Sequence, residues 1–119
     1  MSYGVSAYSK ASVAKEVTPR ELEASLLMKG AAKLEAVKRD WDAKRDLPDA
    51  LAFNRKLWTI LATSVTSEEN PLPQNVKQDF ANLSVFILKT LISLAAEPTT
   101  DKLTQVAEIN ATIAAGLRS

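Results

Sequence analysis

Apolar side chains recur every three or four residues over four long stretches of this chain, and this spacing constrains its fold most strongly. The spacing matches one face of an α-helix, whereas a half-buried strand would alternate at every second residue. The chain shows no useful period-2 stretch and no repeat at a fixed interval. With short connections between the stretches, the sequence predicts an all-α fold, an antiparallel bundle of four main helices plus a short N-terminal helix or segment.

The first long helix has a clear beginning. Thr18 can cap it, Pro19 suits the first helical position, and Glu21 completes a capping-box pattern. We expect this helix to reach about Ala43. Gly30 lies in its middle, where glycine costs about 1 kcal/mol relative to alanine, and close approach of another helix would explain it.

Similar signals delimit the other three helices. Asp46 begins the second, which ends before the polar loop 66–71. Pro73 opens the third, which the sequence Glu97-Pro98 stops because the residue before a proline disfavours helical geometry. Thr100 is the predicted cap of the last helix.

The third helix is the most apolar, and its apolar stripe is wider than one face. Phe86, Leu88 and Ile92 extend the stripe beyond the residues spaced by three and four. Such a helix is typical of the centre of a bundle. The predicted core of the third and fourth helices comprises Leu83, Ile87, Leu91, Ile109 and Ile113.

The length of the chain and the pattern of its first residues indicate its domain organisation. A chain of 119 residues fits one domain, so residues 1–119 are expected to form a single helical domain. Residues 1–14 carry a loose helical stripe of Tyr3, Ala7 and Tyr8 with few large aliphatic side chains. They are the predicted mobile N-terminal segment.

Composition removes most catalytic chemistry. The chain has no cysteine and no histidine, so it lacks thiol nucleophiles, disulfides, the commonest general base and the commonest transition-metal ligand. It has no glycine-rich phosphate loop and no calcium-loop pattern. We therefore expect a protein that is not an enzyme and that needs no cofactor or metal. The net charge of +1 also argues against direct binding of nucleic acid.

The sequence favours a cytoplasmic location. Its first residues lack a charged segment followed by an apolar run, so no signal peptide is expected. Polar residues interrupt the longest apolar stretches, and no segment is expected to reach the roughly 20 apolar residues that span a bilayer.

One polar and aromatic motif, Asn54-Arg55-Lys56-Leu57-Trp58, lies within the second helix. Arg55 and Trp58 are three residues apart and can share a helix face. Either Trp58 fills the core while Arg55 pairs with an acceptor, or Trp58 and its apolar neighbours line a groove for a partner helix. Trp and Arg are common interface anchors.

A second motif, Asn70-Pro71-Leu72-Pro73, predicts a rigid connector because two prolines fix two φ angles. Leu72 is then either an anchor of the loop or an apolar side chain available to a partner.

Together with Asn82-Leu83, Glu108-Ile109-Asn110 and the C-terminal run 113–118, these motifs resemble the FlaF family of bacterial flagellar-biogenesis proteins. The resemblance covers essentially the whole chain and is densest over residues 50–118. It rests on the order and spacing of the motifs, none of which is a catalytic signature.

The resemblance implies a role in flagellum assembly and in control of flagellin production. FlaF proteins act alongside a second regulator, FlbT, and are thought to promote flagellin synthesis or secretion, plausibly as an export chaperone that binds flagellin. Flagellin is then the expected partner and FlbT a further one. The alternative is a post-transcriptional regulator acting through FlbT or flagellin messenger RNA. The candidate partner-binding residues are Asn54, Arg55, Trp58, Leu72, Asn110 and Leu117.

Overall fold

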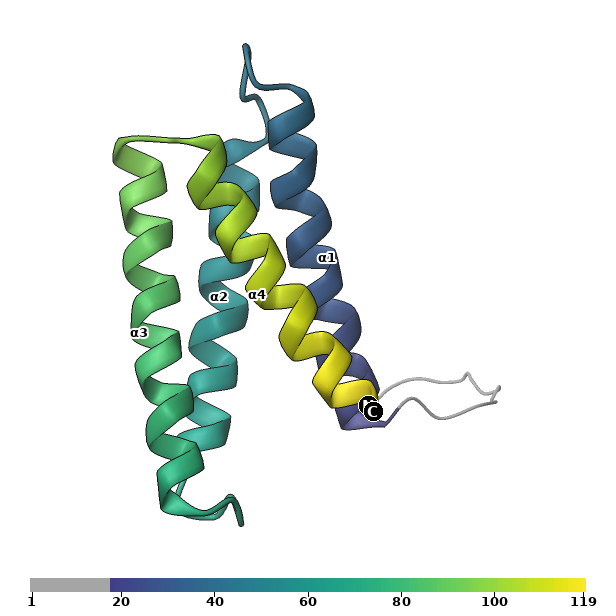
Figure 1. Cartoon of the computed structure of the whole chain (residues 1–119), viewed down its shortest axis with the longest axis vertical. Coiled ribbons are helices and arrows are strands. Elements are labelled where there is room, and N and C mark those ends of the chain that lie inside the picture. The colour runs from purple at the N-terminus through teal and green to yellow at the C-terminus, as the bar shows by residue number, and fades with distance from the viewer. Residues whose placement is uncertain (1–17) are drawn as a thin grey trace.

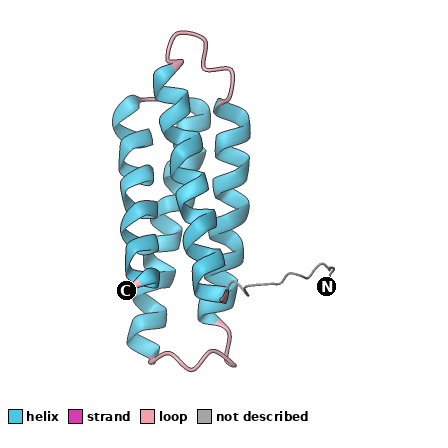
Figure 2. Cartoon of the chain, turned by 90° about the vertical axis from the view of Figure 1, so that its right-hand side faces the viewer, coloured by secondary structure: helices cyan, strands magenta, loops and turns pink. Residues whose placement is uncertain are grey.

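A computed structural model describes residues 18–119 and contains four helices connected by short loops (Figure 1). Consecutive helices run in opposite directions, and the loops lie at the two ends of the bundle (Figure 2). The all-α class with four main helices is confirmed, with no strand within 18–119. The predicted mobile segment, residues 1–14, lies outside the described residues. The helices are α1 (Pro19–Arg39), α2 (Leu47–Thr66), α3 (Gln74–Ala96) and α4 (Thr100–Arg118).

The capping box at the start of α1 forms as predicted. The backbone N–H of Glu21 donates to Thr18 Oγ1 (3.1 Å), and the N–H of Thr18 donates to Glu21 Oε1 (3.2 Å). The helix ends at Arg39, however, and does not reach Ala43. A turn replaces the predicted helical residues 40–43. In it Arg45 donates to the Asp40 carboxylate from its backbone N–H and its guanidinium, at 3.1–3.3 Å.

The α3–α4 connection is as short as predicted, but its cap differs by one residue. Helix α3 ends at Ala96, and Glu97 caps it with its N–H donating to the Ser93 carbonyl. Thr99 is the cap of α4, because its Oγ1 accepts from the N–H of Lys102 (3.2 Å), and Thr100 is the first helical residue. The prediction that Thr100 is the cap is therefore wrong by one position.

The helices pack unequally. α1 contacts α4 most extensively and α2 contacts α3, whereas α3 and α4 contact each other least. Figure 1 shows the reason: α3 and α4 are close at their connection and diverge toward the other end. The prediction that α3 is central is wrong, because α3 lies at the edge of the bundle and packs mainly on α2.

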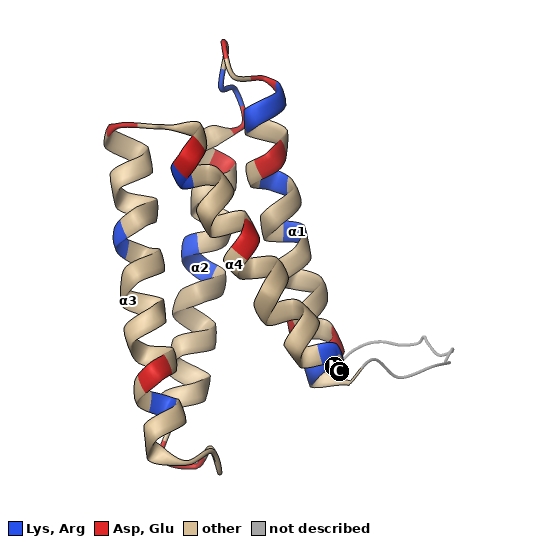
Figure 3. Cartoon of the chain, viewed as in Figure 1, with Lys and Arg blue, Asp and Glu red and all other residues tan. Residues whose placement is uncertain are grey.

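The hydropathy of α3 also corrects a prediction. Within residues 18–119 it is the one helix that is long and apolar enough to cross a membrane. Its ribbon carries few charges (Figure 3). A single such helix is weak evidence for a membrane span, since core helices of soluble proteins meet the same criterion. Only 22% of the most apolar stretch of α3 is buried, so much of its apolar surface is left uncovered.

The predicted core divides into two groups. Ile87 and Leu91 are buried. The other three predicted core residues are half-buried and pack against the core; these are Leu83, Ile109 and Ile113.

Ile87 gives a direct test of this core. Its side chain is fully buried, so Ile87→Ala is expected to lower the free energy of unfolding by about 2–5 kcal/mol. Ile92 is 66% exposed on the same helix, and Ile92→Ala should change it by less than about 0.5 kcal/mol. Urea unfolding followed by circular dichroism measures both. Equal losses in the two variants would contradict the packing of α3.

Candidate functional site

Two asparagines lie in the centre of the bundle with no exposed surface. Asn54 is on α2 and Asn110 is on α4. Asn54 Nδ2 donates to the carbonyl oxygens of Gly30 (3.2 Å) and Ala50 (2.8 Å). Asn54 Oδ1 accepts from Asn110 Nδ2 at 2.8 Å. This set of bonds joins α1, α2 and α4.

Trp58 completes the network. Asn110 Nδ2 also donates to the Leu27 carbonyl (3.1 Å), and Asn110 Oδ1 accepts from Trp58 Nε1 (2.9 Å). Both amide N–H donors of each asparagine, and each amide oxygen, therefore have a partner. A buried polar network of this kind is stable only when its members are satisfied, and here they are.

Gly30 makes room for the network. A Cβ at this position would lie 2.4 Å from Asn54 Oδ1 and 2.9 Å from Asn110 Nδ2. The sequence predicts close approach of another helix at this glycine, and the groups that the structure places against it are the amide side chains of Asn54 and Asn110.

Three of the six predicted binding residues belong to this buried network. Asn54, Trp58 and Asn110 are buried in the bundle and reach no surface. Of the two alternatives for Trp58, filling the core is the one that the structure shows. These three residues therefore do not offer their side chains to a partner in this conformation.

The other three predicted residues are accessible but lie apart. Arg55 is exposed and lines a hollow of about 220 Å³ between α2 and α3, with Ile92 among the other lining residues. Leu72 is exposed in the α2–α3 loop, where its N–H bonds to Asn70 Oδ1 (3.0 Å). Leu117 is half-buried near the end of α4, beside a hollow that Thr18 also lines. The six predicted residues do not form one site.

Several apolar side chains of α3 and α4 are left exposed or half-buried, and the two helices diverge away from their connection (Figure 1). Ser93 of α3 accepts a hydrogen bond from Lys102 Nζ of α4 (2.6 Å), which fixes the side of α3 that faces α4. Phe86 precedes Ser93 by seven residues and therefore lies on the same side of the helix. It is nevertheless 42% exposed, and Figure 1 shows that α4 diverges from α3 with distance from their connection.

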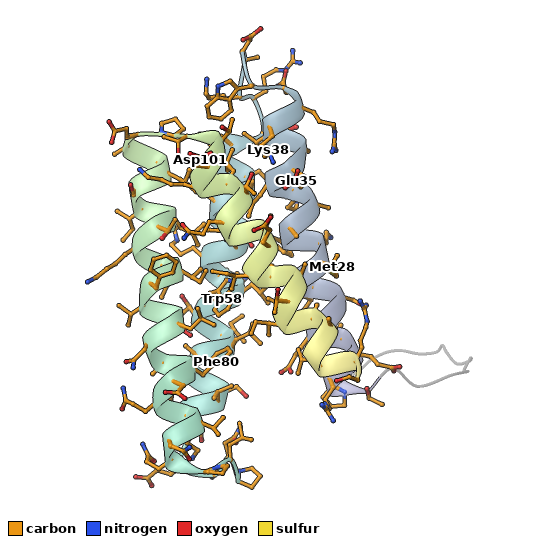
Figure 4. All side chains as sticks on the ribbon, viewed as in Figure 1. Met28, Glu35, Lys38, Trp58, Phe80 and Asp101 are labelled. Carbon is orange, nitrogen blue, oxygen red and sulfur yellow. The ribbon has the colours of Figure 1, made fainter. Side chains whose placement is uncertain are left out.

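Trp58 lies beneath this surface. Its ring stacks on Phe80 of α3 (both labelled in Figure 4), with 5.6 Å between centroids. Its N–H donates to Asn110 of α4. Through Trp58, the buried network therefore contacts both α3 and α4. We define the α3–α4 face as Val76, Phe80, Leu83 and Phe86 on α3 together with Ile109 and Ile113 on α4, all of them exposed or half-buried.

Sequence reasoning missed Phe80 and Phe86 as surface candidates. Phe86 did carry a signal, since it widened the apolar stripe of its helix past one face. From the sequence, these extra apolar side chains predict a helix at the centre of the bundle. In the structure they lie on an uncovered side of α3.

Nothing in residues 18–119 arranges three or more carboxylates that could hold a metal ion. The three ion pairs among these residues, Lys33–Asp49, Lys38–Glu35 and Arg45–Asp40, are at least partly exposed.

The comparison with protein families decides the identity. A family model described as "Flagellar protein FlaF" matches residues 5–117. The chain belongs to the FlaF family. No curated protein and no solved structure matches it. Membership of FlaF makes this a flagellar protein, and its all-α fold has the four main helices that the sequence predicted.

Proposed function

We propose that this FlaF protein is a cytoplasmic, non-enzymatic protein that promotes flagellin synthesis or secretion by binding flagellin as a chaperone. Family membership and the α3–α4 face support the proposal. Flagellin termini are amphipathic segments that need an apolar surface before assembly. An amphipathic helix laid into an apolar groove between two helices is a recurrent mode of peptide recognition.

The observation that most supports this proposal is the uncovered apolar side of α3. Phe86 and Val76 are 42% and 40% exposed, and Ile109 and Ile113 of α4 are half-buried. Exposed apolar side chains gathered on one side of a protein commonly mark an interaction site. A flagellin terminal helix placed along α3 would cover the side that α4 leaves open.

The charge of the molecule favours a protein partner over RNA. The 15 basic and 14 acidic residues leave a net charge of +1. In Figure 3 acidic and basic positions are interleaved along α1 and its exit loop. Binding of RNA depends on a concentrated cationic surface, so the alternative of direct action on flagellin messenger RNA has less physical support. Regulation through FlbT is an outcome that the same experiment tests.

A substitution on the α3–α4 face should weaken flagellin binding. Phe86→Asp places a charge in the proposed interface and is expected to raise the Kd for flagellin at least about tenfold, which corresponds to about 1.4 kcal/mol. Val85→Asp is the matched control, because Val85 is 51% exposed on the adjacent position of the same helix but points to another side. Titration calorimetry at tens of micromolar measures both variants against the parent, with thermal melts to show that each is folded.

Flagellin and FlbT are titrated separately. Absence of flagellin binding by the folded parent contradicts the chaperone proposal, and FlbT binding in its place supports the regulatory alternative. If Phe86→Asp and the parent bind flagellin with equal affinity, then the α3–α4 face is not part of the interface.

A further inference from the structure

A second apolar hollow lies between α1 and α2, on the side of the bundle away from the α3–α4 face. Its volume is about 280 Å³. We call it the α1–α2 groove; it is lined by Leu26, Phe53, Lys56, Leu57 and Ile60. Ile60 is 55% exposed, and Leu22, one turn before Leu26, is 53% exposed. None of these side chains belongs to the surface assigned to flagellin.

The rim of the α1–α2 groove is cationic. Lys29 and Lys33 place their Nζ atoms 5.6 Å and 5.3 Å from the centre of the Phe53 ring, and Lys56 lines the groove itself. Contact with the ring holds the two α1 ammonium groups at the edge of the apolar surface. Within residues 18–119, Lys33 alone of the three lysines has an ion-pair partner, Asp49 at 2.6 Å.

We infer that the α1–α2 groove binds an acidic amphipathic helix of another protein. Such a helix would place apolar side chains, spaced by three and four residues, against Leu26, Phe53 and Ile60. Asp or Glu residues flanking its apolar stripe would meet the lysines at the rim. The apolar contacts supply affinity, and the lysines select the charge and orientation of the partner. This inference goes beyond the flagellin proposal and does not depend on it.

Charge argues against the chain's own N-terminal residues as the occupant. Residues 1–17 carry Lys10, Lys15 and Glu16, so their side chains sum to one positive charge. Placing them against Lys29 and Lys56, the two rim lysines without an ion-pair partner among residues 18–119, would bring like charges together, which costs binding energy at an interface. An acidic segment reverses the sign of that interaction.

Two designed peptides test the inference on the full chain. Both have the same helical apolar stripe at positions i, i+3, i+4 and i+7, and they differ in carrying either Glu or Lys on the flanks. In fluorescence anisotropy the Glu peptide should bind with a Kd in the range of tens of micromolar, and the Lys peptide should bind at least about tenfold more weakly. Raising the salt concentration should reduce the difference in Kd between the Glu peptide and the Lys peptide, because screening weakens exposed charge pairs. Equal binding of the two peptides, or none by the Glu peptide, overturns the inference.

Variants locate the binding. Ile60→Glu should abolish binding of the Glu peptide, whereas Ile92→Glu, at a 66% exposed isoleucine on α3, should leave it unchanged. The double variant Lys29→Glu with Lys56→Glu should exchange the preference, so that the Lys peptide binds more tightly than the Glu peptide. Because each of these positions is exposed, thermal melts should show all variants folded. A preference that survives the double variant overturns the role of the lysines.

Vesicles test the alternative in which the same lysines and apolar side chains lie on a membrane. Co-sedimentation with vesicles rich in phosphatidylglycerol should be weak and unaffected by Ile60→Glu. Strong vesicle binding that Ile60→Glu abolishes, together with no discrimination between the peptides, contradicts the inference and assigns the groove to a lipid surface.

Discussion

Gly30→Ala will destabilise the bundle by about 2–4 kcal/mol, although alanine is the better helix former by about 1 kcal/mol. The added Cβ would lie 2.4 Å from Asn54 Oδ1, so the amide must move. Its bonds to Asn110 and to the Gly30 carbonyl are then lost or weakened in a site that water does not reach. Each buried polar group left without a partner costs about 1–3 kcal/mol, which exceeds the gain in helix propensity.

Gly116→Ala is the matched control. Gly116 is also helical, but a Cβ there meets nothing within 4 Å. This variant should be equal to the parent or more stable by up to about 1 kcal/mol. Urea unfolding of both variants gives the comparison. If Gly30→Ala stabilises the protein as Gly116→Ala does, then the close approach of α1 to the two asparagines is wrong.

Asn110→Ala should have the largest effect, a loss of about 3–5 kcal/mol in the free energy of unfolding. The change removes bonds to Leu27, Asn54 and Trp58 and leaves a cavity in the core. Trp58 Nε1 and Asn54 Oδ1 would remain buried without their partner. Since small domains are stable by about 5–15 kcal/mol in total, this variant will be close to unfolded at moderate temperature.

A double-mutant cycle separates the hydrogen bond from general packing. Trp58→Phe removes the N–H that Asn110 accepts while keeping an aromatic ring against Phe80. Asn110→Ala should cost less in the Trp58→Phe background than in the parent, because the shared bond is already absent. Strict additivity of the two changes would show that the bond does not contribute. Thr112→Ala, at an exposed position on α4, should have little effect on stability.

The start of α1 and the approximate extent of the four helices could be predicted from sequence because their signals are local. A threonine followed by Pro19 and Glu21 makes the same capping box in any context, and Pro98 disfavours helix whatever packs on it. The exit from α1 was less predictable. It depends on Arg45 reaching back to Asp40, a contact that helical periodicity does not encode.

The site could be predicted only in part, because burial depends on how the helices pack. The motifs that contain Asn54 and Asn110 could be recognised in the sequence, but polar side chains usually indicate a surface position. In the structure the two asparagines are buried in the core and hydrogen-bond to each other. The same limit applies to α3. Its wide apolar stripe was visible, yet a stripe can be covered by helices of the same chain or left for a partner. The divergence of α4 from α3 decides between these, and it is a property of tertiary packing.

Photo-crosslinking identifies both whether flagellin binds this protein and which side of the bundle it covers. A photoreactive amino acid is placed at four exposed positions, one at a time: Val76, Phe86, Val85 and Ile60. The account predicts crosslinks to flagellin from Val76 and Phe86, on the α3–α4 face, and little from Val85 or Ile60. Crosslinking from Val85 or Ile60 with none from Phe86 and Val76 would contradict it.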